Sequence, residues 1–456
     1  MFSLNSVKEI QSKFINGSVD PLDLAEACIA RIDRLNPIYH AWVCIDPEAL
    51  ISSAKKTREF LTRNLPPRQL EGIPVGVKDV FNTSDFPTQM GSTIWKDFTP
   101  GNDARVVYYL KNAGGVILGK TVTAEFAVHA LNQTLNPHNI ALTPGTSSSG
   151  SAVAVALGMV PISIGTQTGG SIIRPASFCG VYGFKPSFGL IPRTGSLKTT
   201  DSLDTIGFFV SHPKDLRNTL EILRVHGPNF PFSYKALKDF KRQNKPINRP
   251  WKVALVKTHT WQYASEQAQN ALLDFAKKID SNIGIDLHEV EVPLILERSH
   301  DVHQTIYEKS LAYYFKEEFK NTEGISSVMR QMIAAGEKVS SIEYQNALVI
   351  QESIIFGMDN FFQKYDILIC LSTAGEAPPR NITEKPDSAL MWTLAHLPAI
   401  NAPVFVTETG IPFGLQIVAR KYNDHLLTNF VEELVQMECL PKNPTPLQNT
   451  LLNETN

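Results

Sequence analysis

The sequence predicts an α/β protein in which helices cover a central β-sheet. Short apolar runs typical of buried strands alternate along the chain with helical patterns, as this layering requires. The chain has 456 residues, 43% of them hydrophobic, which is enough for a large core. A third observation is Gly145–Pro186, where loops rich in glycine and hydroxyl side chains adjoin apolar runs. Because glycine allows close backbone approach and serine is a small nucleophile, we expect a functional site there.

The N-terminal seventy residues are predicted to be helical. Asp20 before Pro21 is typical of a helix start, with a capping side chain followed by proline in the first turn. Apolar side chains then recur at helical spacing from Leu24 to Leu35. We expect Asn36-Pro37 to end this helix.

Strands and helices alternate in the next part of the chain. The patterns predict strands at Ile73–Val80, Val116–Leu118 and Val160–Thr166, and helices at Ala104–Ala113 and Ser151–Leu157. Gly114-Gly115 is the expected stop of the first of these helices.

The sequence pattern changes between Ser211 and Asp366. Asp239–Pro250 is polar and mostly basic, and we expect it to be an exposed connection. Further elements are predicted at Trp251–Val256 (strand), Glu266–Ile279 (helix), Leu287–Val292 (strand), His303–Phe319 (helix) and Ser341–Phe362 (helix). We interpret this part as a variable region over the core rather than an independent domain. The polar tail after Pro441 is predicted to be disordered.

Composition excludes several classes of protein. The formal net charge of −2 argues against a dominant electrostatic grip on nucleic acid or on an acidic membrane. We find no apolar run long enough to span a membrane and no pattern of a secretory signal. The five cysteines form no CxxC pair, so neither a disulfide framework nor a zinc site is indicated. We therefore expect a cytoplasmic protein without a metal.

Lys78 lies in a β-like apolar run, where an ammonium group would lose much of its hydration. Desolvation lowers a lysine pKa and can produce a base that works near neutral pH. The alternative is a surface lysine paired with Asp79, because buried lysines are rare.

Two serines stand in loops that suit catalysis. Ser147 lies in Gly145–Gly150, before a predicted helix, and Ser171 follows Thr168-Gly169-Gly170 directly after a predicted strand. Such a turn exposes a hydroxyl while neighbouring amides form an oxyanion hole. The alternatives are a helix cap for Ser147 and a turn serine for Ser171. The first loop is no phosphate-binding P-loop, because Lys-Ser or Lys-Thr does not follow it.

Taken together, these segments resemble the amidase signature family. The glycine- and serine-rich signature corresponds to Gly145–Pro186, and Ser171 follows Ser147 at the family's spacing of 24 residues. The lysine segment resembles Gly72–Val80, and similar blocks are Asp103–Ala127, Ser202–Gly207 and Pro412–Val418. The resemblance spans most of the chain and is weakest in the variable region.

The resemblance implies one large domain, residues 1–456, with a mixed central sheet flanked by helices. Its parts would be a helical region (1–70), a signature core (71–210), a variable region (211–366) and a C-terminal part of the core (367–440). It also implies that Lys78 is the base, Ser171 the nucleophile, and Ser147 a bridging serine after a cis peptide bond. Amides of Thr168, Gly169, Gly170 and Ser171 would bind the oxyanion, without metal or cofactor.

The chain departs from the family pattern near the nucleophile. Gln167 stands where many relatives have Asp, and Thr146 and Ser149 stand where they have Gly. Arg174 is similar to an arginine that binds an anionic substrate group in some relatives; the alternative is that ion pairs or hydrogen bonds of Arg174 hold the loop.

Three further side chains near these segments receive no catalytic role. Cys179 has no neighbouring base and is expected to be core. His129 and His138 are interpreted as ordinary polar residues.

Three functions follow from these features. The first is a free-standing hydrolase of small amides, with no nucleic-acid or membrane partner and a homodimer left open. The second is an amidotransferase A-type subunit that works with partner chains. Ile173-Arg174-Pro175 departs from the Arg-Gln-Pro usual in that subunit, which favours the hydrolase. The third is a catalytically silent binding protein, against which the intact Lys78, Ser147 and Ser171 argue.

Overall fold

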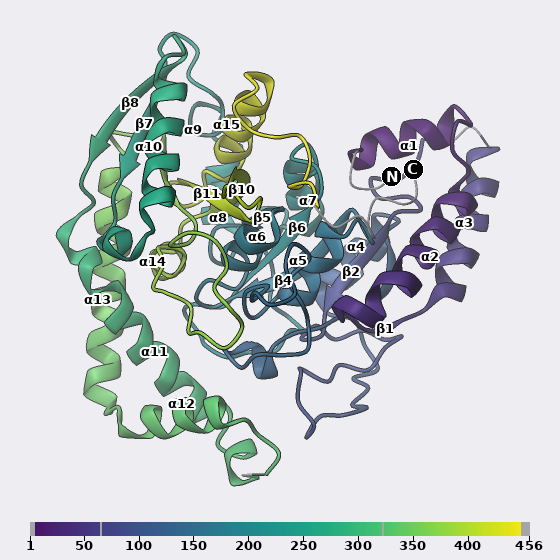
Figure 1. Ribbon diagram of the computed structural model, residues 1–456, viewed down its shortest axis with the longest axis horizontal. Helices are drawn as coiled ribbons and strands as arrows, with labels where there is room; N and C mark the ends of the chain where they lie inside the picture. Colours follow the sequence, from purple (N-terminus) through teal and green to yellow (C-terminus); the bar gives the residue numbers. More distant parts are fainter. Residues whose placement is uncertain (1–4, 64–65, 322, 448–456) are drawn as a thin grey trace.

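A mixed sheet of 11 strands runs through the protein. The computed structural model describes residues 5–63, 66–321 and 323–447, and Figure 1 shows the strands crossing the middle of the molecule. In spatial order the strands are β1 (Trp42–Ile45), β3 (Val116–Thr121), β2 (Pro74–Lys78), β4 (Ile162–Gln167), β6 (Thr205–Val210), β5 (Tyr182–Lys185), β10 (Ala399–Val406), β11 (Pro412–Ala419), β9 (Ile367–Leu371), β7 (Trp251–Val256) and β8 (Ile285–Val290).

Strand direction changes along the sheet. The pairs β3–β2 and β2–β4 are parallel, the pairs from β4 to β9 are antiparallel, and β9–β7 and β7–β8 are parallel again. Edge strand β1 is antiparallel to β3. The predicted α/β fold with a mixed central sheet is therefore confirmed.

Helices cover both faces of this sheet. In the described residues they are α1 (Val7–Ile15), α2 (Pro21–Tyr39), α3 (Pro47–Leu61), α4 (Arg105–Asn112), α5 (Ser149–Ala156), α6 (Ile173–Cys179), α7 (Asp215–Leu223), α8 (Pro231–Lys238), α9 (Phe240–Gln243), α10 (Glu266–Asp280), α11 (Ser299–Tyr314), α12 (Ser327–Lys338), α13 (Ser341–Phe361), α14 (Ala389–Leu394) and α15 (Asp424–Gln436). The elements predicted from periodicity occur, with ends displaced by up to five residues.

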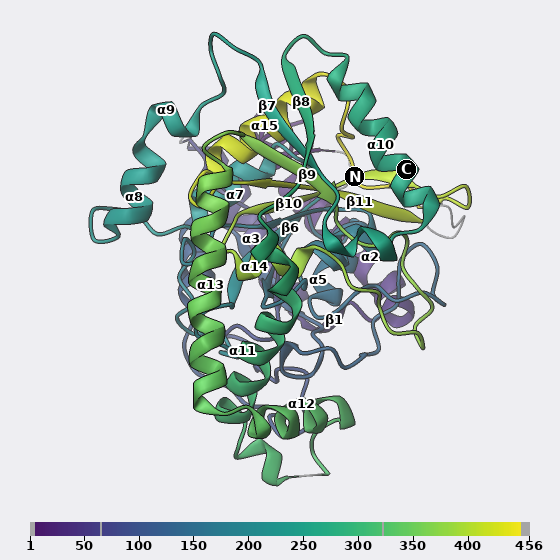
Figure 2. The ribbon, with the colours of Figure 1, turned by 90° about the vertical axis from the view of Figure 1, so that its left-hand side faces the viewer.

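Strand β9 separates two apolar clusters. Ile367, Ile369 and Leu371 pack with α10 and α15 on one face, whereas Leu368 and Cys370 pack with α11, α13 and α14 on the other. This alternation follows the two-residue period of a strand. Figure 2 shows α11 and α13 running side by side, with α12 across their lower ends. The variable region thus adds β7 and β8 to the sheet, α11 to α13 to one face and α10 to the other.

Helix α2 continues past the predicted stop at Pro37. Proline removes one N–H, but this occurs in the last turn, where the loss of a single bond is tolerated. The His40 amide still donates to the Asn36 carbonyl at 2.9 Å, and Tyr39 is buried against the core. The helix ends at His40, which has a left-handed φ of 50°. The prediction of a stop at Asn36-Pro37 was wrong because packing of Tyr39 extends the helix.

The predicted connection Asp239–Pro250 is mostly exposed, but its first half is helical and one residue of it is buried. Residues Phe240–Gln243 form the short helix α9. Gln243 is buried and donates to the Ala236 carbonyl at 2.8 Å. Gln243 departs from the predicted exposure because its side-chain amide bonds to backbone carbonyls of the protein.

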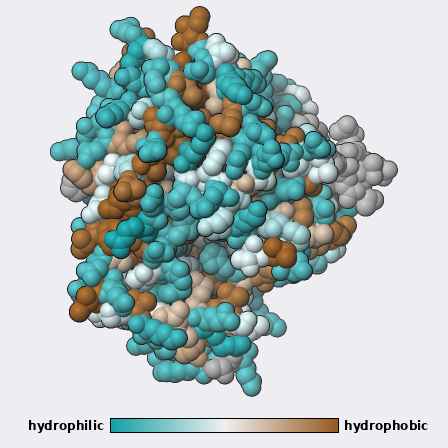
Figure 3. Space-filling model, turned by 60° about the vertical axis from the view of Figure 1, so that its left-hand side comes forward, coloured by the Kyte–Doolittle hydropathy of each residue, from teal (hydrophilic) through white to brown (hydrophobic). Residues whose placement is uncertain are grey.

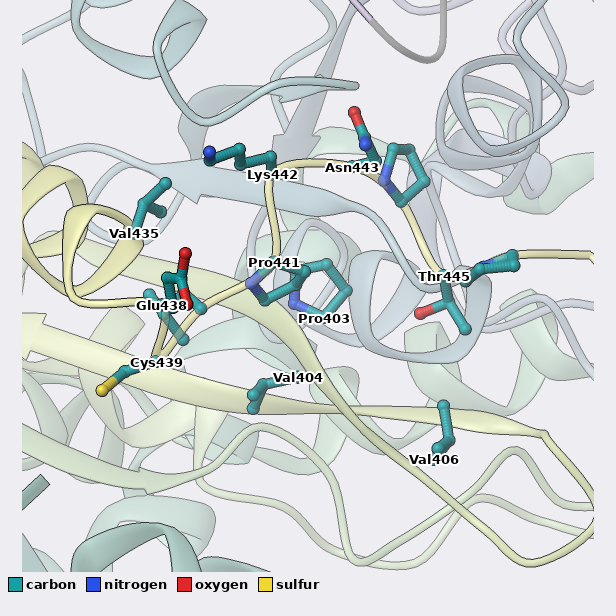
Figure 4. Close-up of a pocket in the computed structure, with 13 residues that line it drawn as sticks. Pro403, Val404, Val406, Val435, Glu438, Cys439, Pro441, Lys442, Asn443 and Thr445 are labelled. Atoms are coloured by element: carbon teal, nitrogen blue, oxygen red, sulfur yellow. The ribbon is translucent and has the colours of Figure 1, made fainter. Parts of the chain in front are cut away.

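The chain after Pro441 also packs on the protein as far as it is described. Thr445 is buried, and its amide donates to the Gly180 carbonyl at 2.8 Å. This segment and β10 line a depression of about 390 Å3, in which Pro441 lies beside Pro403 (Figure 4). The predicted disorder is therefore wrong up to residue 447, and the rest of the tail lies outside the described residues.

The surface carries scattered apolar side chains. The face in Figure 3 is mostly hydrophilic, with hydrophobic side chains gathered in separate patches. On α13, Ile342, Val349 and Phe356 are exposed at intervals of seven residues. Within residues 5–447 as described, we find no helix with the length and apolar character that a membrane crossing needs.

Candidate active site

The parallel strands β2 and β4 end side by side where the predicted catalytic residues lie. Val77 of β2 pairs with Ile164 of β4, so Lys78 at the end of β2 lies next to the end of β4. The loop that leaves β4 carries Ser171. Because parallel strands carry their carboxyl ends at one edge, and ligands bind outside such ends, this edge is the candidate site.

Lys78 is enclosed by three hydroxyl groups. Its Nζ lies 2.8 Å from Ser147 Oγ, 2.9 Å from Ser148 Oγ and 2.9 Å from Thr166 Oγ1. The lysine side chain is completely buried. The predicted contact between Lys78 and Ser147 is therefore present, whereas no sequence pattern indicated Ser148 and Thr166 as further partners.

No carboxylate lies against Lys78 in the described chain. Burial lowers its pKa well below the ordinary value of 10.5, and the charge of Asp204 opposes this only in part. Asp79 instead pairs with Lys120 at 3.0 Å. The alternative of a surface lysine paired with Asp79 is therefore wrong, because Lys78 and Asp79 point to different partners from adjacent positions of the chain.

The hydroxyl protons can be assigned around a neutral Lys78. Ser148 Oγ donates to the Thr166 carbonyl at 3.0 Å, so this oxygen can only accept from the amine. A neutral amine has two N–H groups and one lone pair, so one of the other two hydroxyls must donate to Nζ. Ser147 is one of these two, and the arrangement therefore suits an amine that accepts the Ser147 proton.

The loop that carries Ser147 has the cis peptide bond that the resemblance implied. The bond between Thr146 and Ser147 is cis, and the chain then enters α5. Close approach to β4 depends on Gly165, because a Cβ there would lie 2.9 Å from Ser148 Oγ. The small residues of this segment thus let the serine loop lie directly on the strand.

The loop before Ser171 is held through its carbonyl groups. The Thr168 carbonyl accepts from His303 Nε2 at 2.8 Å, and the Gly169 carbonyl accepts from Thr393 Oγ1 at 2.7 Å. The Gly170 carbonyl accepts from the amide of Arg174 at 2.8 Å. Three consecutive carbonyls therefore point into the protein.

The amides of the same peptide units point the opposite way. In a planar trans peptide, the N–H is directed away from the C=O. Within the described residues we find no hydrogen bond donated by the amides of Gly169, Gly170 or Ser171. These amides are therefore available to bind a developing negative charge beside the Ser171 hydroxyl.

Gln167 holds the start of α6. Its Oε1 accepts from the amides of Ile172 at 2.7 Å and Ile173 at 3.0 Å. Its Nε2 donates to Thr393 Oγ1 at 2.8 Å. The glutamine thus accepts from two amides, as a carboxylate would, and adds a donated bond that a carboxylate cannot make.

The two serine loops are adjacent, but their hydroxyls are not hydrogen-bonded to each other. A Cβ on Gly145 would lie 3.0 Å from Pro175, so the Ser147 loop packs against α6. In the described chain we find no hydrogen bond between Ser147 Oγ and Ser171 Oγ; both side chains are buried. The structure therefore brings Lys78 and Ser147 into contact and Ser171 into the neighbouring loop.

Arg174 forms ion pairs with two carboxylates. Its guanidinium pairs with Asp387 at 2.7 Å and Glu384 at 3.1 Å. The Thr146 amide also bonds to Glu384. These contacts favour the structural alternative for Arg174. The two carboxylates neutralise its charge, and Glu384 connects Arg174 to the loop that carries Ser147. A role in substrate binding stays a prediction.

A cavity of about 690 Å3 adjoins the two serine loops. Thr146 and Arg174 form part of its wall, together with His129, His300, Leu131 and Leu390. The pKa of His129 is lowered to about 4, mainly by burial and in part by the positive charge of Arg174. Sequence reasoning treated His129 as ordinary, because a lone histidine outside any motif carries no signal of a cavity wall.

Several other residues lie near the site, some predicted from the sequence and some not. Cys179 is buried in the core, as predicted. Asp204 accepts from Thr168 Oγ1 at 2.8 Å and was missed, as were His303 and Thr393. Their contacts join segments far apart in the sequence, which local patterns do not reveal. The search for metal sites among the described residues finds no group of three or more suitable ligands.

Comparison with known proteins identifies the family of the chain. The amidase family model matches residues 23–428. The chain belongs to the amidase family. The A-type subunit of the glutamyl-tRNA(Gln) amidotransferase of Synechococcus elongatus is 28% identical over 453 residues, covering 91% of this chain and 94% of that protein. The putative amidase AmiD of Mycobacterium bovis is 29% identical over 424 residues, covering 89% and 88%.

Solved structures share the fold over nearly the whole length. An amidase structure superposes with a TM-score of 0.83 at 26% identity, covering 96% of this chain and all of the other. The peptide amidase of Stenotrophomonas maltophilia gives a TM-score of 0.83 at 23% identity, covering 98% and 99%. Relatives of this family member thus include both amidases and one component of an amidotransferase.

Proposed function

We propose that the protein hydrolyses a carboxylic amide through an acyl-enzyme intermediate. Ser171 is the nucleophile, Ser147 passes its proton, and Lys78 is the base that accepts it. The observation that carries this proposal is the buried Lys78 amine, held 2.8 Å from Ser147 Oγ with no carboxylate partner among the described residues. A buried amine without a carboxylate partner is neutral at a pH at which an exposed lysine is still protonated. A serine hydroxyl needs such a base to remove its proton before it can attack.

The reaction begins when Ser171 Oγ attacks the amide carbonyl carbon. Its proton moves to Ser147 Oγ as the Ser147 proton moves to Lys78 Nζ, and the carbonyl becomes an oxyanion. The amides of Gly169, Gly170 and Ser171 stabilise that charge, and losing one such donor typically costs about 3–4 kcal/mol. Catalytic hydrogen bonds are often long before substrate binds, which agrees with Ser147 and Ser171 hydroxyls that do not yet bond to each other.

Collapse of the tetrahedral intermediate completes the first half of the reaction. The C–N bond breaks, the proton returns from Lys78 through Ser147 to the leaving nitrogen, and amine or ammonia departs. Water then attacks the ester carbonyl and gives its proton to the same relay. The C–O bond to Ser171 breaks, Ser171 regains a proton, and the carboxylic acid leaves.

The cavity beside the serine loops is the proposed substrate pocket. Its volume of about 690 Å3 suits a small organic amide. Leu131 and Leu390 give it apolar walls, while His129 and His300 offer neutral hydrogen-bonding groups. Its wall also carries the charged side chains of Arg380 and Lys385, besides the paired Arg174, Glu384 and Asp387, so it suits an amide with both apolar and polar groups.

The proposal is tested by a panel of amides and by covalent labelling. Wild type should hydrolyse at least one aryl or aliphatic amide and should react with a fluorophosphonate at one serine, identified by peptide mass. Ser171→Ala should lose both, with a loss of turnover of about 10⁴-fold or more. An active, folded Ser171→Ala protein, or labelling at another serine, would contradict it.

The second candidate is an amidotransferase A-type subunit that releases ammonia from glutamine. It is favoured by the relative from Synechococcus elongatus, which aligns over 91% of this chain. The discriminating experiment uses the purified chain alone, without ATP or partner proteins. Turnover of a simple amide supports the hydrolase, whereas activity that appears only with partner proteins and glutamine supports the second candidate.

A further inference from the structure

We propose that His303 is a positioning residue for the oxyanion-binding amides, supplied by the variable region to the signature core. It would act through Thr168, whose carbonyl it holds, and so orient the amide of Gly169. This inference rests on the proposed hydrolase function. It assigns a role to α11, a helix in the part of the chain that least resembles the family.

The contact between His303 and the loop is direct and its direction is fixed. His303 Nε2 lies 2.8 Å from the Thr168 carbonyl oxygen. Because a carbonyl oxygen can only accept, Nε2 carries the proton. A Cβ on Gly169 would lie 3.7 Å from the Cε1 and Nε2 atoms of His303, so the ring also lies against the next residue. The imidazole therefore touches the peptide unit that joins Thr168 to Gly169.

This contact determines where the Gly169 amide points. The Thr168 carbonyl and the Gly169 N–H belong to one planar peptide unit and point in opposite directions. Rotating this unit about its flanking bonds would turn the N–H away from the oxyanion. Within the described residues, His303 is the donor that we find for the Thr168 carbonyl. Removing it frees the unit to rotate.

The surroundings keep His303 rigid and neutral. The side chain is buried, and its ring packs edge-on against Tyr307 at 5.6 Å between centroids. The pKa of His303 is lowered to about 4, mainly by burial, although its hydrogen bond to the Thr168 carbonyl opposes this shift. A neutral imidazole with its proton on Nε2 is thus a fixed single donor aimed at Thr168.

Packing of α11 does not need this imidazole. Val302, Ile306 and Leu311 already anchor the helix in the apolar cluster with α12 to α14. A polar ring buried in such a helix face loses hydration, and its hydrogen bond to Thr168 offsets that loss. A positioning role therefore predicts effects on catalysis that a packing role does not.

The test compares three substitutions with a packing control on the same helix. His303→Gln keeps an N–H donor at a similar reach, His303→Asn places its amide short of Thr168, and His303→Leu has no donor. Ile306→Ala, one turn further along α11, should lower the melting temperature without touching the loop. For each, we would measure kcat, KM, melting temperature and inhibition by a trifluoromethyl ketone, which forms an oxyanion with the nucleophile.

The positioning role predicts a specific pattern. His303→Asn and His303→Leu should lower kcat about 10- to 100-fold with KM nearly unchanged, because only transition-state binding is lost. Affinity for the trifluoromethyl ketone should fall by the same factor, His303→Gln should recover most of both, and Ile306→Ala should keep wild-type kcat.

Three results would overturn the positioning role. They are an unchanged kcat in both His303→Asn and His303→Leu, an equal fall of kcat in His303→Gln and His303→Asn, or a change in KM with kcat unchanged. If His303→Leu does not fold, the contrast between Gln and Asn still decides. An inactive wild type would instead contradict the proposed hydrolase itself.

Discussion

Lys78 and Lys120 are both completely buried, on neighbouring strands, yet they have opposite surroundings. In the described chain, Lys78 Nζ meets three hydroxyls and no carboxylate. Lys120 Nζ meets Asp79 at 3.0 Å, the Phe81 carbonyl at 2.9 Å, and further oxygens of Pro87 and Thr88. Burial lowers the pKa of both lysines, well below 10.5 for Lys78, while the charge of Asp79 opposes the shift at Lys120.

The chemistry of the partners explains why one lysine is a candidate base. Carbonyl and carboxylate oxygens only accept, and the Thr88 hydroxyl already donates to the Phe81 carbonyl, so the oxygens around Lys120 suit an ammonium group. Hydroxyls accept or donate, so the site around Lys78 is equally satisfied by a neutral amine. Burial alone does not make a lysine a base. Its partners must also be hydroxyl groups, which can donate a proton to the neutral amine.

Substituting each lysine by methionine is expected to give the largest difference between the two sites. Lys78→Met should lower kcat/KM by about 10³- to 10⁴-fold, because the general base is lost. The unfolded chain keeps Lys78 protonated up to about pH 10.5 whereas the fold favours the neutral form, so this lysine destabilises the fold at neutral pH. The melting temperature of Lys78→Met should therefore stay level or rise.

Lys120→Met is the matched control. It leaves Asp79 buried without its partner and should lower the free energy of unfolding by about 3–5 kcal/mol. Activity per folded molecule, measured well below the melting temperature, should stay near that of wild type. A stable but inactive Lys120→Met, or an active Lys78→Met, would remove the distinction between the two lysines.

Two adjacent serines contact Lys78, and only one is proposed to carry the proton. Ser147→Ala should lower kcat/KM by about 10³-fold, because the path from Ser171 to Lys78 is interrupted. Ser148→Ala removes one hydrogen bond to Lys78 and one to the Thr166 carbonyl, but leaves the proton path intact, and should cost at most about tenfold. Both are measured with the same amide substrate. Equal losses would indicate that either hydroxyl serves as the bridge.

The pH dependence of turnover follows the proton on Lys78. At low pH the amine is protonated and cannot accept, so kcat/KM should rise with pH through the lowered pKa and level off well below 10.5. The same limb should persist, at lower rate, in Ser148→Ala. A rate that keeps rising to about pH 10 would mean that Lys78 titrates like an exposed lysine.

A smaller effect is expected at Gln167. In Gln167→Glu the two amides of α6 keep their acceptor, but the Thr393 hydroxyl now turns to the carboxylate and releases the Gly169 carbonyl. We expect a fall in kcat of about three- to tenfold, typical of one hydrogen bond. Thr393→Val should cause a similar loss, and the double variant should lose little more, because both act on one contact.

The fold followed from the sequence where patterns were local. Strand β2, the small-residue helix α5 and the long helix α13 were predictable from periodicity, since each element buries one face or all of itself. The end of α2 and the packing of the chain around Thr445 were not, because each depends on contacts with segments distant in the sequence.

The candidate site divides in the same way. Lys78, Ser147 and Ser171 stand in recognisable motifs, so their types and spacing suggested the chemistry. His303 and Thr393, which hold the carbonyls of the Ser171 loop, come from outside these motifs. No local pattern marks a histidine on α11 as a partner of Thr168, which lies 135 residues earlier in the chain.

The proposed mechanism requires an uncharged Lys78, and nitrogen NMR measures the protonation of its amine. In protein labelled with 15N at lysine side chains, the Nζ signal absent from Lys78→Met belongs to Lys78, and its chemical shift reports protonation. We expect a neutral amine at about pH 8, while the signal of Lys120 remains that of an ammonium ion. An Nζ of Lys78 that stays protonated above about pH 10 would contradict it.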